Sequence, residues 1–230
     1  MNFWDKHYKE RVNLTSNRCY QVGKTIDGRP VGKDQVDLIV RTISERLNLS
    51  KNDHIIDIGC GNGLLSEQLI SRVSHITAMD RSEQLLSVAR EKISHGNLDF
   101  IKCSIGDEIF ARALRRSSAT KAFLYEVVQL LTSTEVDVLL RLISSSTVET
   151  VYMGGIPDRL KLGDYYDTPE KLEFFLDSEK KGKPHMGKWW TFDELYETCL
   201  LNGFSAIRLP QDQSLYTSYY RFDLIVERMS

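Results

Sequence analysis

The sequence has few of the features that mark several common protein classes. Its four cysteines, Cys19, Cys60, Cys103 and Cys199, show no CxxC spacing, so neither a metal site nor a disulfide framework is expected. No apolar run approaches the roughly 18 residues of a membrane-spanning helix. The first residues, MNFWDKHYKERVN, are charged throughout and lack the apolar core of a signal peptide. We therefore expect a cytoplasmic protein that binds no metal.

The sequence also lacks an excess of charge of either sign. Its 30 Lys and Arg residues and 32 Asp and Glu residues leave a formal net charge of -2 at pH 7. Such a chain has no global positive field that would gather the phosphates of nucleic acid or an anionic membrane surface. We expect neither nucleic acid nor a membrane as a partner. The sequence leaves the oligomeric state open.

What is present is the composition of an ordinary globular protein, with 41% apolar and 27% charged residues. The length of 230 residues predicts a single domain over residues 1–230. Short apolar segments typical of strands alternate with amphipathic helices along most of the chain. We expect strands at residues 54–58, 76–79, 98–101, 121–125, 148–153 (closed by Gly154-Gly155), 204–209 and 220–227.

This alternation predicts an α/β fold, a Rossmann-like three-layer sandwich with a mostly parallel seven-stranded sheet. The last two strands follow each other without a helix between them, which predicts an antiparallel hairpin at the C-terminal edge. Two segments interrupt the pattern with glycine and proline: an N-terminal arm, residues 1–33, and an insertion, residues 156–190. We expect the arm to act as a lid and the insertion to be a lid that faces the substrate.

The most informative motif is the loop Asp57-Ile58-Gly59-Cys60-Gly61-Asn62-Gly63, where a buried strand gives way to a helix. Glycines at alternate positions let the backbone pass close to a ligand, and the start of a helix offers free amide groups. Asp80 ends the next strand, where a carboxylate can accept hydrogen bonds from ribose hydroxyls. The loop reads GxGxG rather than the GxGxxG of dinucleotide sites, so NAD is the weaker alternative.

Residues 54–82 resemble the class I S-adenosylmethionine-dependent methyltransferase superfamily, whose first motif is [D/E]xGxGxG and whose second strand ends in an acidic residue. The resemblance implies S-adenosyl-L-methionine as the cofactor and methyl transfer as the reaction. It implies that Asp57 orients the loop and reaches the methionine ammonium through water or an amide. It also implies that Asp80 holds the ribose and that Arg81 flanks the adenine. The residues that would pass beneath the methionine are Gly59, Gly61 and Gly63, and Cys60 between them is a further candidate cofactor contact.

The sequence differs from the superfamily pattern after the third strand, where the family often has an acidic residue near the adenine amino group. The matching position here is Ser104, which leaves its hydroxyl, the Ile105 amide or a shifted Asp107 as alternatives for the adenine contact. At the fourth strand, Tyr125 and Gln129 occupy the segment that usually lines the methyl-donor channel. Both are candidate catalytic residues, and Tyr125 is also a candidate cofactor contact.

Three flanking segments resemble bacterial methyltransferases associated with glycans and other small metabolites. They are residues 21–25 with 27–30, residues 154–158, and residues 220–223. The resemblance implies a small-molecule acceptor such as a sugar, methylated on oxygen or, as alternatives, on nitrogen or carbon. Two further alternatives are a methyltransferase of RNA or protein, which the missing basic patch disfavours, and a catalytically silent partner subunit of the same fold.

Methyl transfer from a sulfonium needs the acceptor in the right position more than it needs a strong base. An acceptor hydroxyl would nevertheless benefit from a base, and histidine is best matched to neutral pH. The candidate is His185 in the insertion, with His7 in the arm as the weaker alternative. The histidines at strand starts or in a turn are expected to be structural: His54, His75 and His95.

The insertion also gathers three aromatic residues, Tyr165, Tyr166 and Trp189. Such side chains can stack on a sugar or an aromatic ring, but in an ordered loop they more often form its own small core. We expect the core role. The neighbouring run at residues 177–183 mixes both signs of charge, so we expect a solvated surface there.

Overall fold

The computed structural model describes residues 3–229. Its main strands are β3 (His54–Ile58), β4 (His75–Asp80), β5 (Leu98–Lys102), β6 (Lys121–Tyr125), β7 (Thr150–Pro157), β8 (Phe204–Pro210) and β9 (Arg221–Arg228). Within residues 3–229 they form a seven-stranded sheet in the order β5-β4-β3-β6-β7-β9-β8. The strands from β5 to β7 are parallel, and β9 is antiparallel to both β7 and β8. The predicted α/β class and the antiparallel edge hairpin are confirmed.

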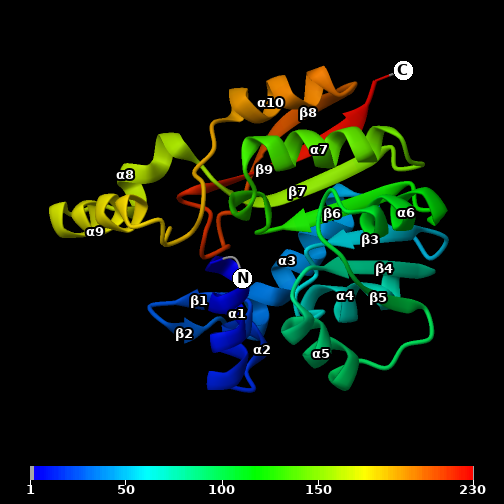
Figure 1. Ribbon diagram of the computed structural model, residues 1–230, viewed down its shortest axis with the longest axis horizontal. Coiled ribbons are helices and arrows are strands. Elements are labelled where there is room, and N and C mark those ends of the chain that lie inside the picture. The colour runs from blue at the N-terminus through cyan, green and yellow to red at the C-terminus, as the bar shows by residue number, and fades with distance from the viewer. Residues whose placement is uncertain (1–2, 230) are drawn as a thin grey trace.

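Helices cover both faces of this sheet (Figure 1). On one face lie α3 (Lys33–Arg46), α4 (Leu64–Leu69) and α5 (Glu83–Lys92), and on the other lie α6 (Glu108–Arg116), α7 (Ser133–Ser144) and α10 (Phe192–Leu201). Successive residues of a strand point to opposite faces, so Ile55 and Ile56 of β3 belong to different apolar clusters. A parallel sheet that buries both faces gives the three layers that the sequence predicts.

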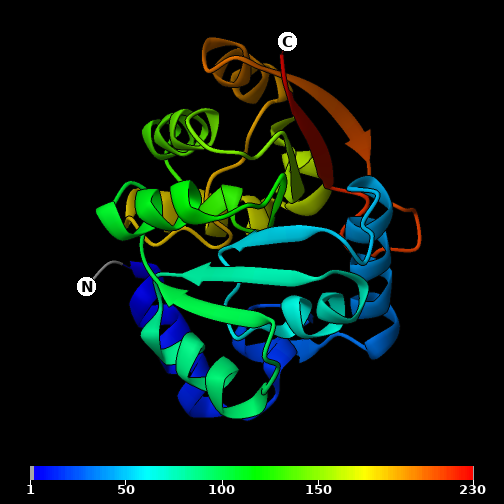
Figure 2. The same ribbon diagram turned by 90° about the vertical axis from the view of Figure 1, so that its right-hand side faces the viewer.

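The N-terminal arm consists of α1 (Phe3–Leu14), α2 (Arg18–Gln21) and a small hairpin of β1 (Thr25–Ile26) and β2 (Arg29–Pro30). Figure 2 shows α1 lying along α5, at the side of the sheet that carries the glycine loop. Ion pairs attach the arm to this layer. Arg81 Nε donates to Asp5 Oδ1 at 2.8 Å, and Arg18 Nη1 donates to Glu67 Oε2 at 2.5 Å.

The insertion begins inside a strand rather than after it. We expected this strand to end at Gly154-Gly155, but β7 continues to Pro157 through a bulge between Met153 and Ile156. Gly155, at φ 70°, absorbs the extra residue, which explains why two glycines did not end the strand. The short helices η3 (Arg159–Lys161) and α8 (Leu162–Tyr165) follow, and then α9 (Pro169–Lys180).

Figure 1 shows α8 and α9 projecting from the body of the molecule on the side of the N-terminal arm. The chain then returns to the sheet, where Lys188 N donates to Gln129 O at 2.7 Å and Trp190 N donates to Pro157 O at 2.9 Å. Two other short helices, η1 (Ile70–Arg72) and η2 (Val128–Leu130), follow α4 and β6. No helix within residues 3–229 combines the length and the apolar character needed to cross a membrane.

Candidate active site

The glycine loop between β3 and α4 passes directly over the carboxyl end of β4. The amides of Gly59 and Cys60 both donate to Met79 O, at 2.7 and 3.0 Å. Gly59 has φ 80°, and a Cβ atom there would lie 2.4 Å from Val127 Cγ2. Only glycine combines this backbone conformation with this close approach. The loop is therefore shaped by its glycines.

Asp80 ties the loop to the end of β4. Its Oδ2 accepts a hydrogen bond from Gly61 N at 2.8 Å, and its Oδ1 accepts one from Ser82 N at 2.7 Å. Burial raises the pKa of Asp80, while these backbone hydrogen bonds and Arg81 lower it. Each carboxylate oxygen keeps capacity for a further hydrogen bond, because an ionised carboxylate accepts about four.

A first cavity of about 1120 Å³ lies between this loop and α1. Its walls come from the glycine loop, the ends of β4 and β6, the segment after β5 and the N-terminal arm. Most of the expected cofactor residues meet here: Gly59, Cys60, Gly61, Asp80, Arg81, Ser104, Ile105 and Tyr125. Asp107 does not, because its carboxylate accepts hydrogen bonds from Ser104 N and Phe110 N, both at 2.7 Å, at the start of α6.

Asp57 and Gly63 also lie outside the lining of the first cavity. Asp57 is buried in β3 and accepts a hydrogen bond from Ser66 Oγ at 2.5 Å. Burial raises its pKa to about 7, against the opposing hydrogen bond from Ser66. A Cβ atom at Gly63 would lie 2.7 Å from Ile93 Cδ1, so this glycine lets α4 pack closely rather than exposing backbone to the cavity.

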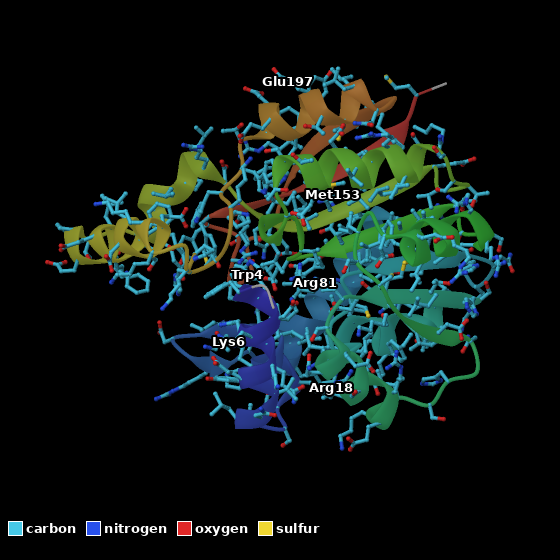
Figure 3. All side chains as sticks on the ribbon, viewed as in Figure 1. Trp4, Lys6, Arg18, Arg81, Met153 and Glu197 are labelled. Carbon is cyan, nitrogen blue, oxygen red and sulfur yellow. The ribbon has the colours of Figure 1, made fainter. Side chains whose placement is uncertain are left out.

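A second cavity of about 710 Å³ adjoins the first. It lies between α1, the end of β6, the insertion and the segment before β9, and it is lined by two expected catalytic residues, Gln129 and His185. Five residues line both cavities: Trp4, Tyr8, Val22, Glu126 and Leu130. Figure 3 shows Trp4 at the start of α1, and both Trp4 and Arg81 line the first cavity. A ligand in one cavity can thus touch a ligand in the other.

Residues 55–145 match a family model described as a methyltransferase domain. The chain is thus similar to methyltransferases over this segment, which is less than half of its length. Its fold is shared with the magnesium protoporphyrin IX methyltransferase of Synechocystis, solved with bound SAH, at a TM-score of 0.63 and 18% identity over 98% of this chain and 96% of that one. The mitomycin 7-O-methyltransferase structure shares it at a TM-score of 0.66 and 13% identity, over 100% of this chain and 61% of that one.

Similarity to curated sequences is limited to short segments. An uncharacterized methyltransferase of Schizosaccharomyces pombe is 36% identical over 56 residues, or 24% of this chain and 22% of the relative. A ubiquinone biosynthesis O-methyltransferase of Xylella fastidiosa is 48% identical over 48 residues, or 21% of this chain and 19% of the relative. The aligned segments thus span about a fifth of the relatives' length.

Glu126 lies at the centre of this candidate site, although no pattern in the sequence identified it. It directly follows β6 and has φ 58°, a backbone conformation that is rare for a residue with a Cβ atom. Its Oε2 accepts from Lys24 Nζ at 2.5 Å, its Oε1 lies 3.7 Å from Arg221 Nη1, and Tyr216 Oη donates to Oε1 at 3.4 Å. Burial alone would raise the pKa of Glu126, but Lys24 and Arg221 hold it below its usual value.

The bulge in β7 makes room for this carboxylate. Glu126 N donates to Gly154 O at 2.8 Å, and a Cβ atom at Gly155 would lie 2.7 Å from Glu126 Cγ. Gly155 O also accepts a hydrogen bond from Arg221 Nη1, and Gly155 N donates to Asp223 Oδ1 at 2.8 Å. Each flanking segment singled out in the sequence therefore contributes to this cluster, through Lys24, Gly155 and Arg221.

Two buried side chains that were expected in the site from the sequence have unused polar atoms. Tyr125 Oη and Gln129 Oε1 have no hydrogen-bond partner among residues 3–229, and both side chains are 7% exposed. Tyr125 lines the first cavity and Gln129 the second. Because buried polar atoms are almost always hydrogen-bonded, these two atoms are suited to a ligand.

The histidines and aromatics divide between the cavity wall and the core. His7 and His185 line the second cavity, and burial lowers the pKa of each below its usual value. His185 Nδ1 lies 3.2 Å from Tyr166 Oη. Tyr166 and Trp189 are buried in an aromatic cluster of the insertion, as expected, whereas Tyr165 belongs to both this cluster and the cavity wall. His54 contacts Ser118 and Thr77, and His75 pairs with Asp99, as structural residues do.

Proposed function

We propose that this protein transfers a methyl group from S-adenosyl-L-methionine to a hydroxyl oxygen of a small molecule such as a sugar. One observation carries the proposal: a cavity built on the glycine loop and Asp80 adjoins a second cavity across the Glu126 carboxylate. A cofactor and an acceptor can then meet at the shared wall. The segment that matches the methyltransferase family model, residues 55–145, supplies most of the first cavity.

The residues of the first cavity fit this cofactor. Asp80 offers acceptor capacity for the ribose hydroxyls, and Arg81 can flank the adenine, with Ser104 or the Ile105 amide at its edge. Lys24 lines the same cavity and suits the carboxylate of the cofactor, while Tyr125 Oη is an unused donor there. When bound, S-adenosylmethionine supplies a methyl group on a sulfonium sulfur, a good leaving group.

The residues of the second cavity fit a small hydroxylated acceptor. Its walls combine the aromatic rings of Tyr165, Tyr216 and Tyr220 with the polar atoms of Gln129 and His185. Aromatic rings stack on the apolar faces of a sugar, and the unused Gln129 Oε1 can accept a hydrogen bond from a hydroxyl.

Two groups can act on the acceptor hydroxyl. The Glu126 carboxylate lies on the wall common to both cavities, where it can orient the hydroxyl toward the methyl group. Burial lowers the pKa of His185, so its imidazole is neutral at pH 7 and can accept the hydroxyl proton. Positioning by Glu126, Gln129 and Tyr125 would account for most of the rate.

The N-terminal arm and the insertion serve as lids in this proposal, within one domain over residues 1–230. The arm contributes Trp4 and Tyr8 to both cavities, and the insertion contributes His185 and Met186 to the second. Within the arm, α1 contacts the rest of the site through the partly exposed pair of Asp5 with Arg81, and a contact of this kind is weak enough to open. Opening of the lids would admit the cofactor and release the products.

Calorimetry with S-adenosylmethionine and S-adenosylhomocysteine tests the cofactor site. We expect micromolar binding of both, and Asp80→Ala should weaken it by roughly 100-fold, since hydrogen bonds to a charged group each contribute about 1.5–3 kcal/mol. The control is Asp99→Ala, which removes an exposed carboxylate on β5. A folded protein that binds neither compound would refute the proposed function. Unchanged affinity in Asp80→Ala would refute the ribose contact alone.

A further inference from the structure

Buried positive charge exceeds buried negative charge beside the second cavity. The side chains of Lys24 and Arg221 are 5% and 7% exposed, and the only carboxylate within 4.0 Å of either, among residues 3–229, is that of Glu126. Two cations thus share one anion, and the cluster keeps a net charge of +1. A buried charge without a partner is costly, so a site of this kind suits an anion supplied by a ligand.

Arg221 has donors to spare on the side of the cavity. Its Nη1 donates to Gly155 O, Nη2 lies 4.0 Å from the Met186 sulfur, and Nε has no hydrogen-bond partner among residues 3–229. The guanidinium group also lies over the Tyr220 ring, 5.1 Å from its centroid. A thioether is a weak acceptor for a guanidinium. Arg221 lines the second cavity and does not line the first. Its unused donors therefore belong to the acceptor side of the site.

A second arginine reaches the same cavity from the N-terminal arm. Arg11 Nε donates to His7 Nε2 at 2.9 Å and Nη1 donates to Tyr20 O at 2.7 Å, and within residues 3–229 Arg11 forms no ion pair with a carboxylate. Arg11 lines the second cavity but not the first. Its positive charge lowers the pKa of both His7 and His185, after burial, which keeps these imidazoles neutral.

The charges are thus sorted between the two cavities. In the first, the pairs Asp5–Arg81 and Lys24–Glu126 cancel, and the carboxylates of Asp80 and Glu135 remain. In the second, apart from the shared Glu126, the ionised groups of the wall are the guanidinium groups of Arg11 and Arg221. Burial lowers the pKa of both histidines there and raises the pKa of Tyr8, Tyr165 and Tyr216, so these groups add no charge at pH 7.

We propose that the acceptor carries an acidic group, a carboxylate or a phosphate, that binds to Arg221 and Arg11 in the second cavity. This inference rests on the proposed function and narrows its acceptor to a sugar acid, a sugar phosphate or a similar hydroxylated anion. A guanidinium group binds both kinds of anion through paired hydrogen bonds. Gln129 Oε1 then accepts a hydrogen bond from a hydroxyl of the same molecule.

An alternative ligand for these positively charged side chains is the carboxylate of the cofactor itself. Lys24, the cation on the wall of the first cavity near Glu126, is well placed for that carboxylate. Neither arginine lines the first cavity, so both remain for the acceptor. If the carboxylate of the cofactor bound to the two arginines, small anions would compete with the cofactor instead of binding beside it.

Calorimetry on the protein saturated with S-adenosylhomocysteine tests the inference, with D-glucuronate, D-glucose 6-phosphate and neutral D-glucose as probes. At least one acidic sugar should bind roughly tenfold more tightly than glucose, and Arg11→Gln should abolish this preference while Arg11→Lys retains it. Arg41→Gln, an exposed arginine outside both cavities, is the control and should change nothing. Equal binding of acidic and neutral sugars, or displacement of S-adenosylhomocysteine by the anions, would refute the inference.

A second experiment identifies the acceptor directly. The protein is incubated with trideuteromethyl S-adenosylmethionine and a small-molecule extract of its source cells, and labelled products are separated by anion exchange at neutral pH. The labelled product should be retained and should contain a carboxylate or a phosphate by mass spectrometry. A neutral or cationic labelled product would overturn the inference and leave the proposed function intact. Lack of cofactor binding in the first calorimetric experiment would instead overturn the proposed function.

Discussion

Replacement of Glu126 by glutamine tests whether the buried charge cluster is organised as described. The substitution keeps the shape of the side chain but leaves Lys24 and Arg221 buried without an anion. Both cations are at most 7% exposed, and Lys24 Nζ lies 2.5 Å from the carboxylate. Removal of one partner of such a pair costs about 3–5 kcal/mol, because the other charge stays buried and unpaired. We expect Glu126→Gln to lose this amount of unfolding free energy.

A double-mutant cycle with Lys24 separates the ion pair from other effects of the substitution. Lys24→Met should destabilise less than Glu126→Gln, because Glu126 keeps Arg221 at 3.7 Å and the hydrogen bond from Tyr216. The double variant should lose less than the sum of the two single losses, with a coupling of about 1–3 kcal/mol. Urea unfolding followed by circular dichroism at neutral pH measures all four proteins, with an unchanged m value as the sign of comparable unfolded states.

A loss of unfolding free energy below about 1 kcal/mol in Glu126→Gln, which is typical of an exposed ion pair, would show that the charge cluster is not organised in this way. Zero coupling between the two positions would show the same, since it would mean that the two charges act independently. Glu126→Asp serves as the matched control, because it keeps the charge and shortens the side chain by one methylene. It should fall between the wild type and Glu126→Gln.

Three further predictions concern the glycine loop and its surroundings. Burial raises the pKa of Asp57 from 3.8 to about 7, so between these two pH values the folded state binds more protons than the unfolded state. The free energy of unfolding therefore falls as pH rises through this range, by at most about 4 kcal/mol. In Asp57→Asn, the free energies of unfolding at pH 5 and pH 8 should differ much less than in the wild type. Gly59→Ala should weaken the binding of S-adenosylhomocysteine, measured by calorimetry, at least tenfold and lower the free energy of unfolding by about 1–3 kcal/mol. The reason is that φ is 80° at this position and that the new Cβ atom would lie 2.4 Å from Val127. Binding equal to that of the wild type would show that the loop can shift freely. Arg81→Gln removes an ion pair with Asp5 in which both side chains are about one-third exposed, so we expect less than a tenfold loss of cofactor affinity. A loss as large as that of Asp80→Ala would show that the arm contributes more than this one contact.

The fold was predictable because its signals are local. The strands expected at 54–58 and 121–125 match β3 and β6, since an apolar run of this short length with turn residues nearby is typical of a buried strand. The end of β7 was predicted wrongly for the opposite reason. Gly154 and Gly155 are typical of a turn, and their role as a bulge depends on β9 pairing on both sides of them.

The glycine loop and Asp80 were also readable from the chain. They lie about 20 residues apart in one βαβ unit, and the parallel pairing of β3 with β4 brings them together, as Gly61 N and Asp80 Oδ2 at 2.8 Å show. Adjacent parallel strands have their carboxyl ends at the same edge of the sheet. The sequence could therefore locate this half of the site.

The half of the site proposed to bind the acceptor was decided by tertiary structure alone. Lys24 and Glu126 are 102 positions apart, and Arg221 comes from the last strand, so no periodicity or spacing relates the three. The sequence showed the segments that carry Lys24, Gly155 and Arg221, but it could not show that they meet. Their contact depends on the arm folding over the sheet and on β9 inserting between β7 and β8. The sequence by itself thus determined the fold class and the glycine loop, whereas packing of distant segments decided which charges face the second cavity.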